Sequence, residues 1–318
     1  WIKPSELATK QSIWNASHSI GAGLISVICG FLLKHYGYSA WQLCFAVPAA
    51  IALVGAVALF LTLKDTPSSV GLPEIEDMDK DEKSEDKTSD ASLADNMSGK
   101  SFKSFVNRMV FANPLIWILA VSNFCIYVVR FTILDWGATF LTQYKGMEIS
   151  TAGTVVAASE LVGGIAGMLL AGWFTDKFMK SRAHRACFIC TVGATLSFFL
   201  FWKSPAGMPW LSAIFICLSS FFIYGPQALL GTSASQQATK HACATANGIL
   251  GIFGYASTAI SGVTFGYLAE HFGWDSVFLV SVIIGLVGAA VVALMWKAPA
   301  DGYAKAEKVM TEITESEK

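Results

Sequence analysis

Long apolar stretches separated by short polar segments dominate the chain. Eight of them are long enough for a helix to cross a bilayer, and they run approximately over 12–33, 41–63, 114–141, 151–173, 186–202, 208–231, 242–268 and 274–296. Lipid offers no hydrogen-bond partners to exposed backbone, so such stretches are expected to be helical. The pattern therefore predicts an all-α polytopic membrane protein.

Composition and charge support this fold class and give an orientation. Hydrophobic residues make up 54% of the chain, charged residues 14%, and the mean hydropathy is +0.53. Eighteen Lys and Arg residues fall on one side of the predicted spans, and three fall on the other, namely Lys34, Lys145 and Lys203. Because loops rich in Lys and Arg stay in the cytoplasm, both ends of the given chain are predicted to be cytoplasmic.

The segment 64–112 interrupts the apolar pattern. It is acidic, dense in Ser, Asp, Glu and Lys, and almost without aromatic residues until Phe102. Such a composition predicts a solvated cytosolic linker. Two predicted spans precede the linker and six follow it.

An internal repeat explains why the numbers of predicted spans before and after the linker differ. GFLLKHYGYSAW at Gly30–Trp41 matches GYLAEHFGWDSV at Gly266–Val277, with an offset of 236 residues. Parallel six-helix repeats joined by a long loop resemble the build of the major facilitator superfamily. The resemblance implies that the chain holds helices 5 to 12, and that helices 1 to 4 lie before residue 1. The implied domains are 1–63 (last two helices of the first repeat), 64–112 (linker), 113–296 (second repeat) and 297–318 (cytosolic tail).

Arg130 lies in the middle of the third apolar stretch. A guanidinium at that depth costs roughly 2.5–3.5 kcal/mol, so it should face a bundle interior and have a partner. Asn123, Tyr127 and Arg130 follow helical spacing and predict one polar stripe. Asp135 lies off that stripe, which leaves the charge available to an anion. The alternative is a structural Arg neutralised by a carboxylate on another helix, such as Glu160.

His18 is the one ionisable group on the membrane part of the first predicted helix, next to Asn15. A lone His on an apolar face is usually structural. Together with Arg130, however, it suits a phosphate monoester, because Arg offers a planar fork of donors. His can change charge in the range where the second phosphate proton is lost.

The loop GWFTDKFMKSRAHR, residues 172–185, has its own pattern. It resembles the superfamily's G-x-x-x-D-[RK]-x-x-[RK]-x-[RK]-R loop at Gly172, Asp176, Lys177, Lys180, Arg182 and Arg185. The resemblance implies a role in conformational gating, in which these groups hold cytoplasmic helix ends together and release them. The alternative is a basic cytoplasmic loop with no further duty. Asp135 and Glu160 are also assigned to gating, because the expected ligand is itself anionic.

Several motifs together resemble the organophosphate:inorganic phosphate antiporters, the family of the bacterial glycerol-3-phosphate and hexose-6-phosphate transporters. The motifs are WNxxHxxG from residue 14, NFxxYxxRxxILDW from residue 123, FIYGP at Phe222–Pro226 and GIFGYAS at 251–257. In that family one Arg on helix one and one on helix seven hold the phosphate, and the second matches Arg130. A helix-five His matches His18, and pocket tyrosines match Tyr127, Tyr224 and Tyr255.

The resemblance implies a bacterial inner-membrane antiporter that imports a small organophosphate in exchange for inorganic phosphate. Its partners would be the phosphorylated metabolite, inorganic phosphate and the bilayer, with no nucleic acid, and the protein would be a monomer. Two alternatives stay open: a membrane sensor of external sugar phosphate, and a facilitator for another organic anion. No nucleophile–base pair or metal-ligand spacing is present in the sequence, so neither an enzyme, a cofactor nor a metal is expected.

Overall fold

The structure is a computed structural model that describes residues 6–64, 68–71 and 99–316. Within these ranges the ordered elements are helical and none is a strand, as the hydropathy pattern predicts. The chain forms two compact units. Of the described residues, one unit comprises 17–64 and 68–71, and the other comprises 6–16 and 99–316.

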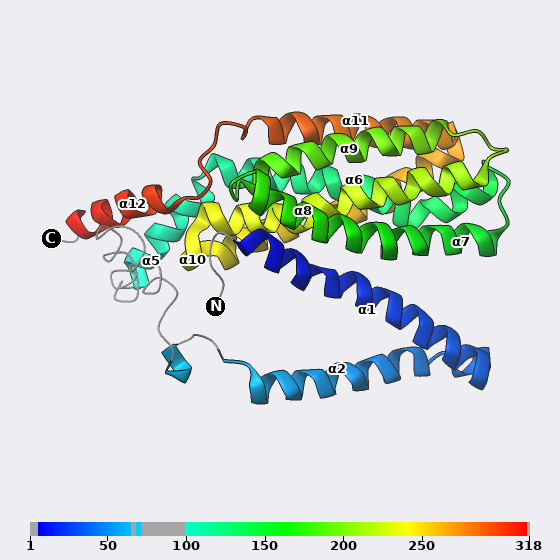
Figure 1. The fold of residues 1–318 in the computed structure, drawn as a ribbon, viewed down its shortest axis with the longest axis horizontal. Helices are drawn as coiled ribbons and strands as arrows, with labels where there is room; N and C mark the ends of the chain where they lie inside the picture. Colours follow the sequence, from blue (N-terminus) through cyan, green and yellow to red (C-terminus); the bar gives the residue numbers. More distant parts are fainter. Residues whose placement is uncertain (1–5, 65–67, 72–98, 317–318) are drawn as a thin grey trace. The chain divides into compact units, whose positions relative to one another are not determined.

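The first unit contains α2 (Leu43–Thr62) and most of α1 (Leu7–Tyr36). In the second unit, long helices run side by side (Figure 1). They are α6 (Pro114–Gln143), α7 (Ile149–Ala158), the π-helical turn η6 (Ser159–Gly163), α8 (Gly164–Phe178), α9 (Ala183–Lys203), α10 (Pro209–Phe272) and α11 (Trp274–Ala293). The first turns of α1, up to Ala16, belong to this unit too.

Helix α10 contains two membrane crossings. Thr239 has non-helical φ and ψ angles of 62° and 173°, so the chain turns there between the predicted spans 208–231 and 242–268. Among the described residues, six helices are long and apolar enough to cross a membrane, and they contain seven of the eight predicted stretches. The remaining stretch, 12–33, lies in α1, which is not among the six.

A glycine of the same backbone conformation follows a helix in both copies of the internal repeat. Helix α1 ends before Gly37, whose φ and ψ angles are 80° and 162°. Helix α10 ends before Gly273, whose angles are 79° and 170°. Only glycine adopts this region readily, because a Cβ atom would clash with the backbone. The glycines are 236 residues apart, so the repeat seen in the sequence is a repeat of local structure.

Much of the predicted linker, 72–98, lies outside the described residues. The end of the linker is helical, as α5 (Gly99–Val106) and a π-helical turn η5 (Asn107–Phe111). Phe105, Met109 and Val110 are fully buried there, so this part is not a solvated chain. The helical spacing of its apolar residues could have revealed this. Lys and Ser are abundant around them, so the composition of this part resembles that of the acidic segment before it.

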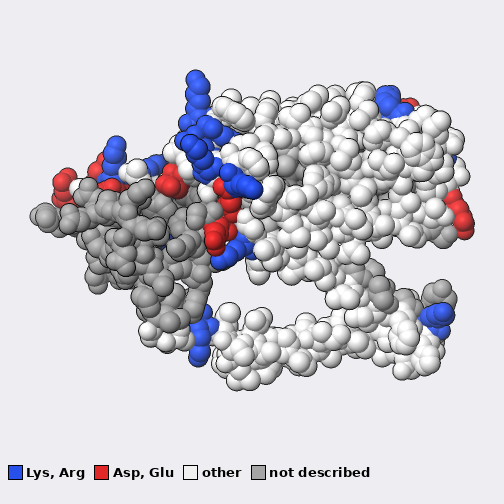
Figure 2. Space-filling model, in the orientation of Figure 1, with Lys and Arg blue, Asp and Glu red and all other residues white. Residues whose placement is uncertain are grey.

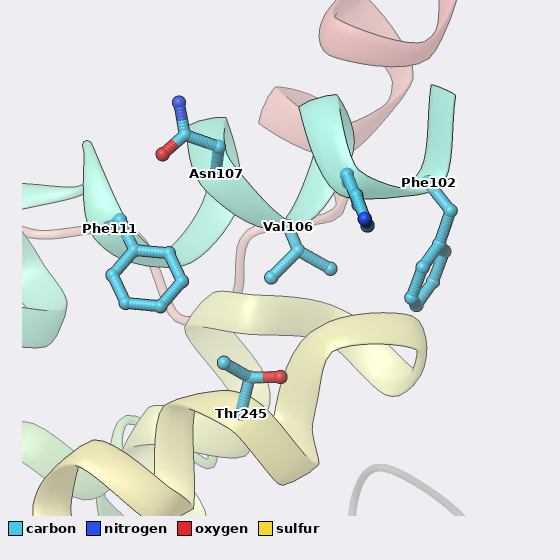
Figure 3. A pocket seen from close by; sticks show the side chains of 6 residues that line it. Phe102, Val106, Asn107, Phe111 and Thr245 are labelled. Atoms are coloured by element: carbon cyan, nitrogen blue, oxygen red, sulfur yellow. The ribbon is translucent and has the colours of Figure 1, made fainter. Parts of the chain in front are cut away.

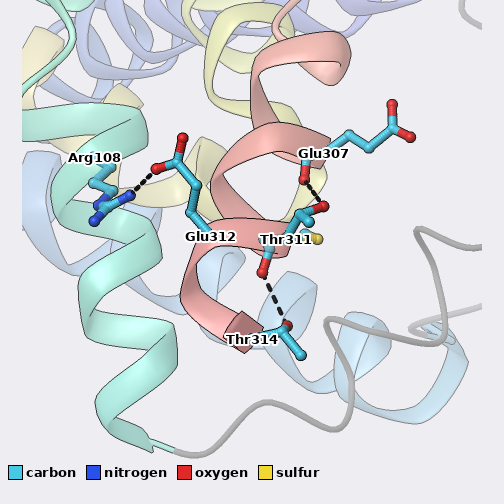
Figure 4. Close-up of polar contacts among 6 residues, drawn as sticks. Arg108, Glu307, Thr311, Glu312 and Thr314 are labelled. Atoms are coloured by element: carbon cyan, nitrogen blue, oxygen red, sulfur yellow. Dashed lines mark hydrogen bonds and ion pairs between the residues drawn. The ribbon is translucent and has the colours of Figure 1, made fainter. Parts of the chain in front are cut away.

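The predicted tail is also helical, as α12 (Tyr303–Ser316), and it packs against α5, η5 and α10. Its buried face consists of Ala306, Val309, Met310 and Ile313. On the exposed side, Arg108 and Glu312 form an ion pair of 2.5 Å between η5 and α12 (Figure 4). An exposed pair contributes little to stability, so the apolar face holds this end together.

Glycines bring η6 and α8 close to α10. A Cβ atom at Gly163 would lie 2.5 Å from the carbonyl oxygen of Cys217, and one at Gly167 would overlap the carbonyl of Phe221. Without a hydrophobic force between helices in lipid, close packing of this kind drives their association.

Charged side chains gather at the two ends of the bundle, while its flank is almost free of charge (Figure 2). At the end remote from α12, Asp275 accepts hydrogen bonds from Trp202 Nε1 (2.7 Å) and Tyr144 Oη (3.2 Å). The ammonium of Lys145 donates to the carbonyls of Trp202 and Ser204, and burial lowers its pKa. These bonds join α6, α9 and α11 outside the apolar layer.

Candidate anion-binding site

Helix α6 positions the polar stripe. It begins at Pro114, which suits the first position of a helix, and Asn113 caps it by accepting a hydrogen bond from the Leu115 amide (3.3 Å). From this start Asn123, Tyr127 and Arg130 lie on the side of α6 that contacts α10. The stripe predicted from spacing therefore faces other helices of the bundle.

Arg130 is 7% exposed and reaches a carboxylate through a tyrosine. Its Nη2 donates to Tyr224 Oη at 3.3 Å, and that hydroxyl donates to Glu160 Oε2 at 2.7 Å. Within the described chain, Arg130 and Glu160 form no direct ion pair, and Arg130 Nε is buried without a hydrogen-bond partner. Glu160 is thus the carboxylate linked to Arg130 through Tyr224. The indirect link leaves donor capacity on the guanidinium.

Three aromatic rings surround the guanidinium. Its Cζ lies 5.5 Å from the ring centre of Tyr127, 5.3 Å from that of Phe131 and 5.1 Å from that of Tyr224. The negative faces of such rings stabilise a cation where water is excluded. The aromatic groups therefore help to hold a charge at a depth where it would otherwise be costly.

The π-helical turn η6 and the glycine after it place Glu160 and Tyr224. Such turns insert one extra residue in a helix and are frequent at functional sites. Gly164 lets the ring of Tyr224 approach, because a Cβ atom there would lie 3.1 Å from the ring. Ser220 Oγ also donates to Ser159 Oγ at 3.3 Å. These contacts fix the α10 segment that carries Tyr224 against η6.

The other end of the stripe contacts the second half of α10. Asn123 Nδ2 donates to the Leu250 carbonyl at 2.8 Å, and Tyr127 and Tyr255 lie ring to ring at 6.2 Å. Gly254 makes this approach possible, since a Cβ atom there would lie 2.8 Å from Asn123 Nδ2. Asn123 therefore joins α6 to α10. Tyr255 adds another aromatic ring beside Tyr127.

Two predicted site residues, His18 and Asp135, take no part in the contacts that Arg130 makes with the aromatic rings and with Tyr224 Oη. His18 belongs to the other compact unit, so its part in the site stays a prediction. Asp135 lies on α6 with an exposed side chain, and in the described part of the chain it forms no ion pair. Its assignment to gating also stays a prediction.

Asp176 joins the end of α8 to the beginning of α1. Its Oδ2 accepts hydrogen bonds from the Thr9 amide (2.7 Å) and from Thr9 Oγ1 (2.6 Å). Gly172, one turn earlier, leaves room for Ser12, since a Cβ atom there would lie 2.5 Å from Ser12 Oγ. A carboxylate at a helix N-terminus satisfies an unpaired amide and interacts favourably with the helix dipole. Asp176 thus binds the first turn of α1.

The basic residues of the same loop have separate contacts. Lys177 lies over the ring of Trp173 (4.9 Å), and Arg185 donates from Nε to the Trp296 carbonyl (3.1 Å). Arg182 immediately precedes α9. Arg185 therefore ties the start of α9 to the chain that follows α11.

The sequence reasoning missed three features of this region. Phe131 lies against the guanidinium, Thr9 is the partner of Asp176, and Glu160 lies in a π-helical turn. The consecutive glycines after Glu160 were a visible signal for unusual packing at that point. No group of His, Cys, Asp and Glu that could hold a metal occurs among the described residues.

The chain is similar to known membrane proteins over most of its length. The model of the Major Facilitator Superfamily matches residues 1–262. The chain is 32% identical over 300 residues to the glycerol-3-phosphate transporter of Bacillus subtilis, covering 93% of this chain and 65% of that protein. It is 32% identical over 303 residues to the probable hexose phosphate transport protein of Chlamydia muridarum, covering 94% and 64%. It is 30% identical over 289 residues to the membrane sensor protein UhpC of Salmonella typhimurium, covering 91% and 63%.

The chain thus spans slightly less than two thirds of the length of these relatives. Their names agree with the resemblance to organophosphate:inorganic phosphate antiporters that the motifs indicate. Two are named for the transport of phosphorylated compounds, one of them as probable, and the third is named as a sensor.

Proposed function

Because the chain belongs to the major facilitator superfamily, a superfamily of transporters rather than enzymes, we propose that it forms part of an antiporter. The antiporter imports a small organophosphate, such as a hexose 6-phosphate or glycerol 3-phosphate, in exchange for inorganic phosphate. The observation that carries the proposal is Arg130, a buried guanidinium linked to its carboxylate only through Tyr224, with Nε unpartnered among the described residues.

Phosphate binding follows from the donors on Arg130. The planar guanidinium presents parallel N–H groups that match two phosphate oxygens, and charge-assisted bonds of this kind are about twice as strong as neutral ones. In the proposal, Nε and one Nη donate to the phosphate, and Tyr224 keeps Glu160 nearby as the internal counter-charge. The charge of Arg130 is then balanced by Glu160 when no ligand is bound, so the guanidinium keeps a counter-charge in the empty site.

In the proposal, Tyr127, Tyr255 and Asn123 line the route beside the phosphate, and the assignment of His18 to the site stays a prediction from its motif. Tyr127 and Tyr255 carry hydroxyl groups on rings that already touch, so they can bind the organic part of the substrate. The proposal assigns charge recognition to Arg130 and shape recognition to these neighbours.

Alternating access requires contacts that break and re-form at the basic end of the bundle. In the proposal, Asp176 is such a contact, because it holds the first turn of α1 through Thr9. Lys177, Arg182 and Arg185 keep the loop in place. Asp135 pairs with a basic group as the halves of the transporter move, whereas the gating contact of Glu160 is its link to Arg130 through Tyr224. The Asp176 contact joins elements from both sides of the linker.

Replacing Asp176 with Asn is expected to loosen this contact. The charge contribution at a helix N-terminus is worth up to about 2 kcal/mol, so opening of the first turn of α1 should rise up to about 30-fold. Hydrogen exchange of the backbone amides of residues 7–11 measures this directly. Asp275→Asn, at the other end of the bundle, is the matched control and should leave those amides unchanged. Equal exchange in wild type and Asp176→Asn would remove Asp176 from the gate.

The proposed location is the bacterial inner membrane, with both ends of the chain in the cytoplasm. Cysteines introduced after residue 300 should then react with a membrane-impermeant maleimide only in inside-out vesicles. A cysteine in place of Lys203, which lies at the sparsely charged face, should react only from outside. Labelling of the tail in intact cells would reverse the orientation.

A sensor is the second candidate, because the membrane sensor protein UhpC is similar to this chain to nearly the same extent as the transporters. Proteoliposomes loaded with inorganic phosphate separate the two functions. An antiporter takes up labelled hexose 6-phosphate or glycerol 3-phosphate only when phosphate is inside, and external phosphate competes. A sensor binds the ester without sustained exchange, and that result would replace the transport proposal.

A further inference from the structure

A hollow of about 340 Å³ lies between α5, η5 and the second half of α10, at the end of the bundle that carries α12 (Figure 3). Its lining consists of Phe102, Lys103, Val106, Asn107, Phe111 and Thr245. None of these residues belongs to the Arg130 site. The transport proposal gives this hollow no role.

The walls of the hollow combine apolar and polar groups. Phe102 and Phe111 lie on either side of Val106, and Thr245 faces them from α10 (Figure 3). The two phenylalanines are 42% and 49% exposed, although their neighbour Phe105 is fully buried. Exposed aromatic rings beside a cation and a hydroxyl form a surface with one apolar part and one part suited to an anion.

Two Lys side chains near the hollow have no ion-pair partner among the described residues. Lys100 and Lys103 are exposed on α5, and neither forms an ion pair among the described residues. Arg108 differs, because Glu312 of α12 accepts its hydrogen bond (Figure 4). Two ammonium groups therefore remain available on the same short helix as Phe102.

The position of α5 and η5 along the chain puts them at the membrane boundary. The span α6 begins at Pro114, three residues after Phe111, and the exposed Trp117 donates from Nε1 to the Phe111 carbonyl at 2.8 Å. Aromatic side chains at the start of a span lie at the level of the lipid headgroups. A helix with Lys on one side and Phe on the other suits the same depth.

We propose that this hollow binds an anionic phospholipid. The lipid phosphate contacts Lys103, with Lys100 adding to the local potential and Thr245 donating a hydrogen bond. The first carbons of the acyl chains lie between Phe102 and Phe111. Lipid binding would hold α5 and η5 against α10 and anchor the segment that leads into the Arg130 helix.

Native mass spectrometry of the purified protein in detergent tests the site. Dioctanoyl phosphatidylglycerol and dioctanoyl phosphatidylcholine are titrated separately. Each Lys near an anionic lipid surface is worth about 1 kcal/mol, so Lys100→Gln with Lys103→Gln should weaken phosphatidylglycerol binding roughly 30-fold. The matched control is Lys305→Gln with Lys308→Gln on α12, which removes the same charge and should leave the affinity unchanged.

A second variant tests the apolar part. Phe102→Ser should weaken phosphatidylglycerol binding, and glycerophosphoglycerol, the headgroup without chains, should not compete. Equal binding of the two lipids, or equal losses in the α5 and α12 double variants, would overturn the proposal. Competition by the soluble headgroup would show an anion site rather than a lipid site. Thermal unfolding of each variant in detergent shows whether the fold is kept.

Discussion

Replacing Arg130 with Lys is expected to lower phosphate exchange by roughly 100-fold or more, although the charge is kept. An ammonium cannot reproduce the two parallel donors of a guanidinium, and each hydrogen bond to a charged group is worth about 1.5–3 kcal/mol. Lys also loses the planar contact with the rings of Tyr127, Phe131 and Tyr224. The initial rate of phosphate-dependent uptake in proteoliposomes measures the effect.

Arg108→Lys is the control for this experiment. Arg108 is an exposed Arg that pairs with Glu312 at the end of the bundle, and its replacement should leave exchange near the wild-type rate. Normal exchange by Arg130→Lys would show that the guanidinium is structural and balanced by Glu160 alone.

Replacing Gly167 with Ala is expected to have the largest effect on stability. The added Cβ would overlap the backbone carbonyl of Phe221, and neither helix can yield without moving its backbone. Overpacking usually lowers the free energy of unfolding by about 1–3 kcal/mol. Because the added atom would meet backbone atoms, the loss at this site should be at or above the upper end of that range. The melting temperature in detergent and the folded yield should both fall.

Gly153→Ala provides the comparison, because Gly153 lies in the same hydrophobic stretch and a Cβ there meets nothing within 4 Å. Its melting temperature should stay unchanged or rise slightly, since Ala favours the helix. Equal stability of the two variants would mean that α8 and α10 are not packed through Gly167.

The sequence predicted the spans well, because apolar length is the main requirement of a membrane helix. It also predicted the separation of the two crossings within α10, through the polar residues around Lys240, and the local repeat at Gly37 and Gly273. It did not predict α5, η5 and α12. Their amphipathic helices are short and rich in charge, and their composition resembles that of a solvated segment.

The candidate site was predicted in its residue types but not in its connections. Helical spacing placed Asn123, Tyr127 and Arg130 on one face, since all three belong to one helix. Spacing cannot show that Tyr224 links Arg130 to Glu160, because those residues are far apart in the chain. The π-helical turn that carries Glu160 depends on packing against α10, which a single sequence does not reveal.

The central claim is that Arg130 binds the phosphate group of the transported ester. An experimental structure of the protein with a bound hexose 6-phosphate or glycerol 3-phosphate tests it most directly. The account predicts phosphate oxygens at about 2.7–2.9 Å from Arg130 Nε and one Nη, with Tyr224 still bonded to Glu160. A ligand bound away from the guanidinium, with Arg130 Nε still unpartnered, would contradict it.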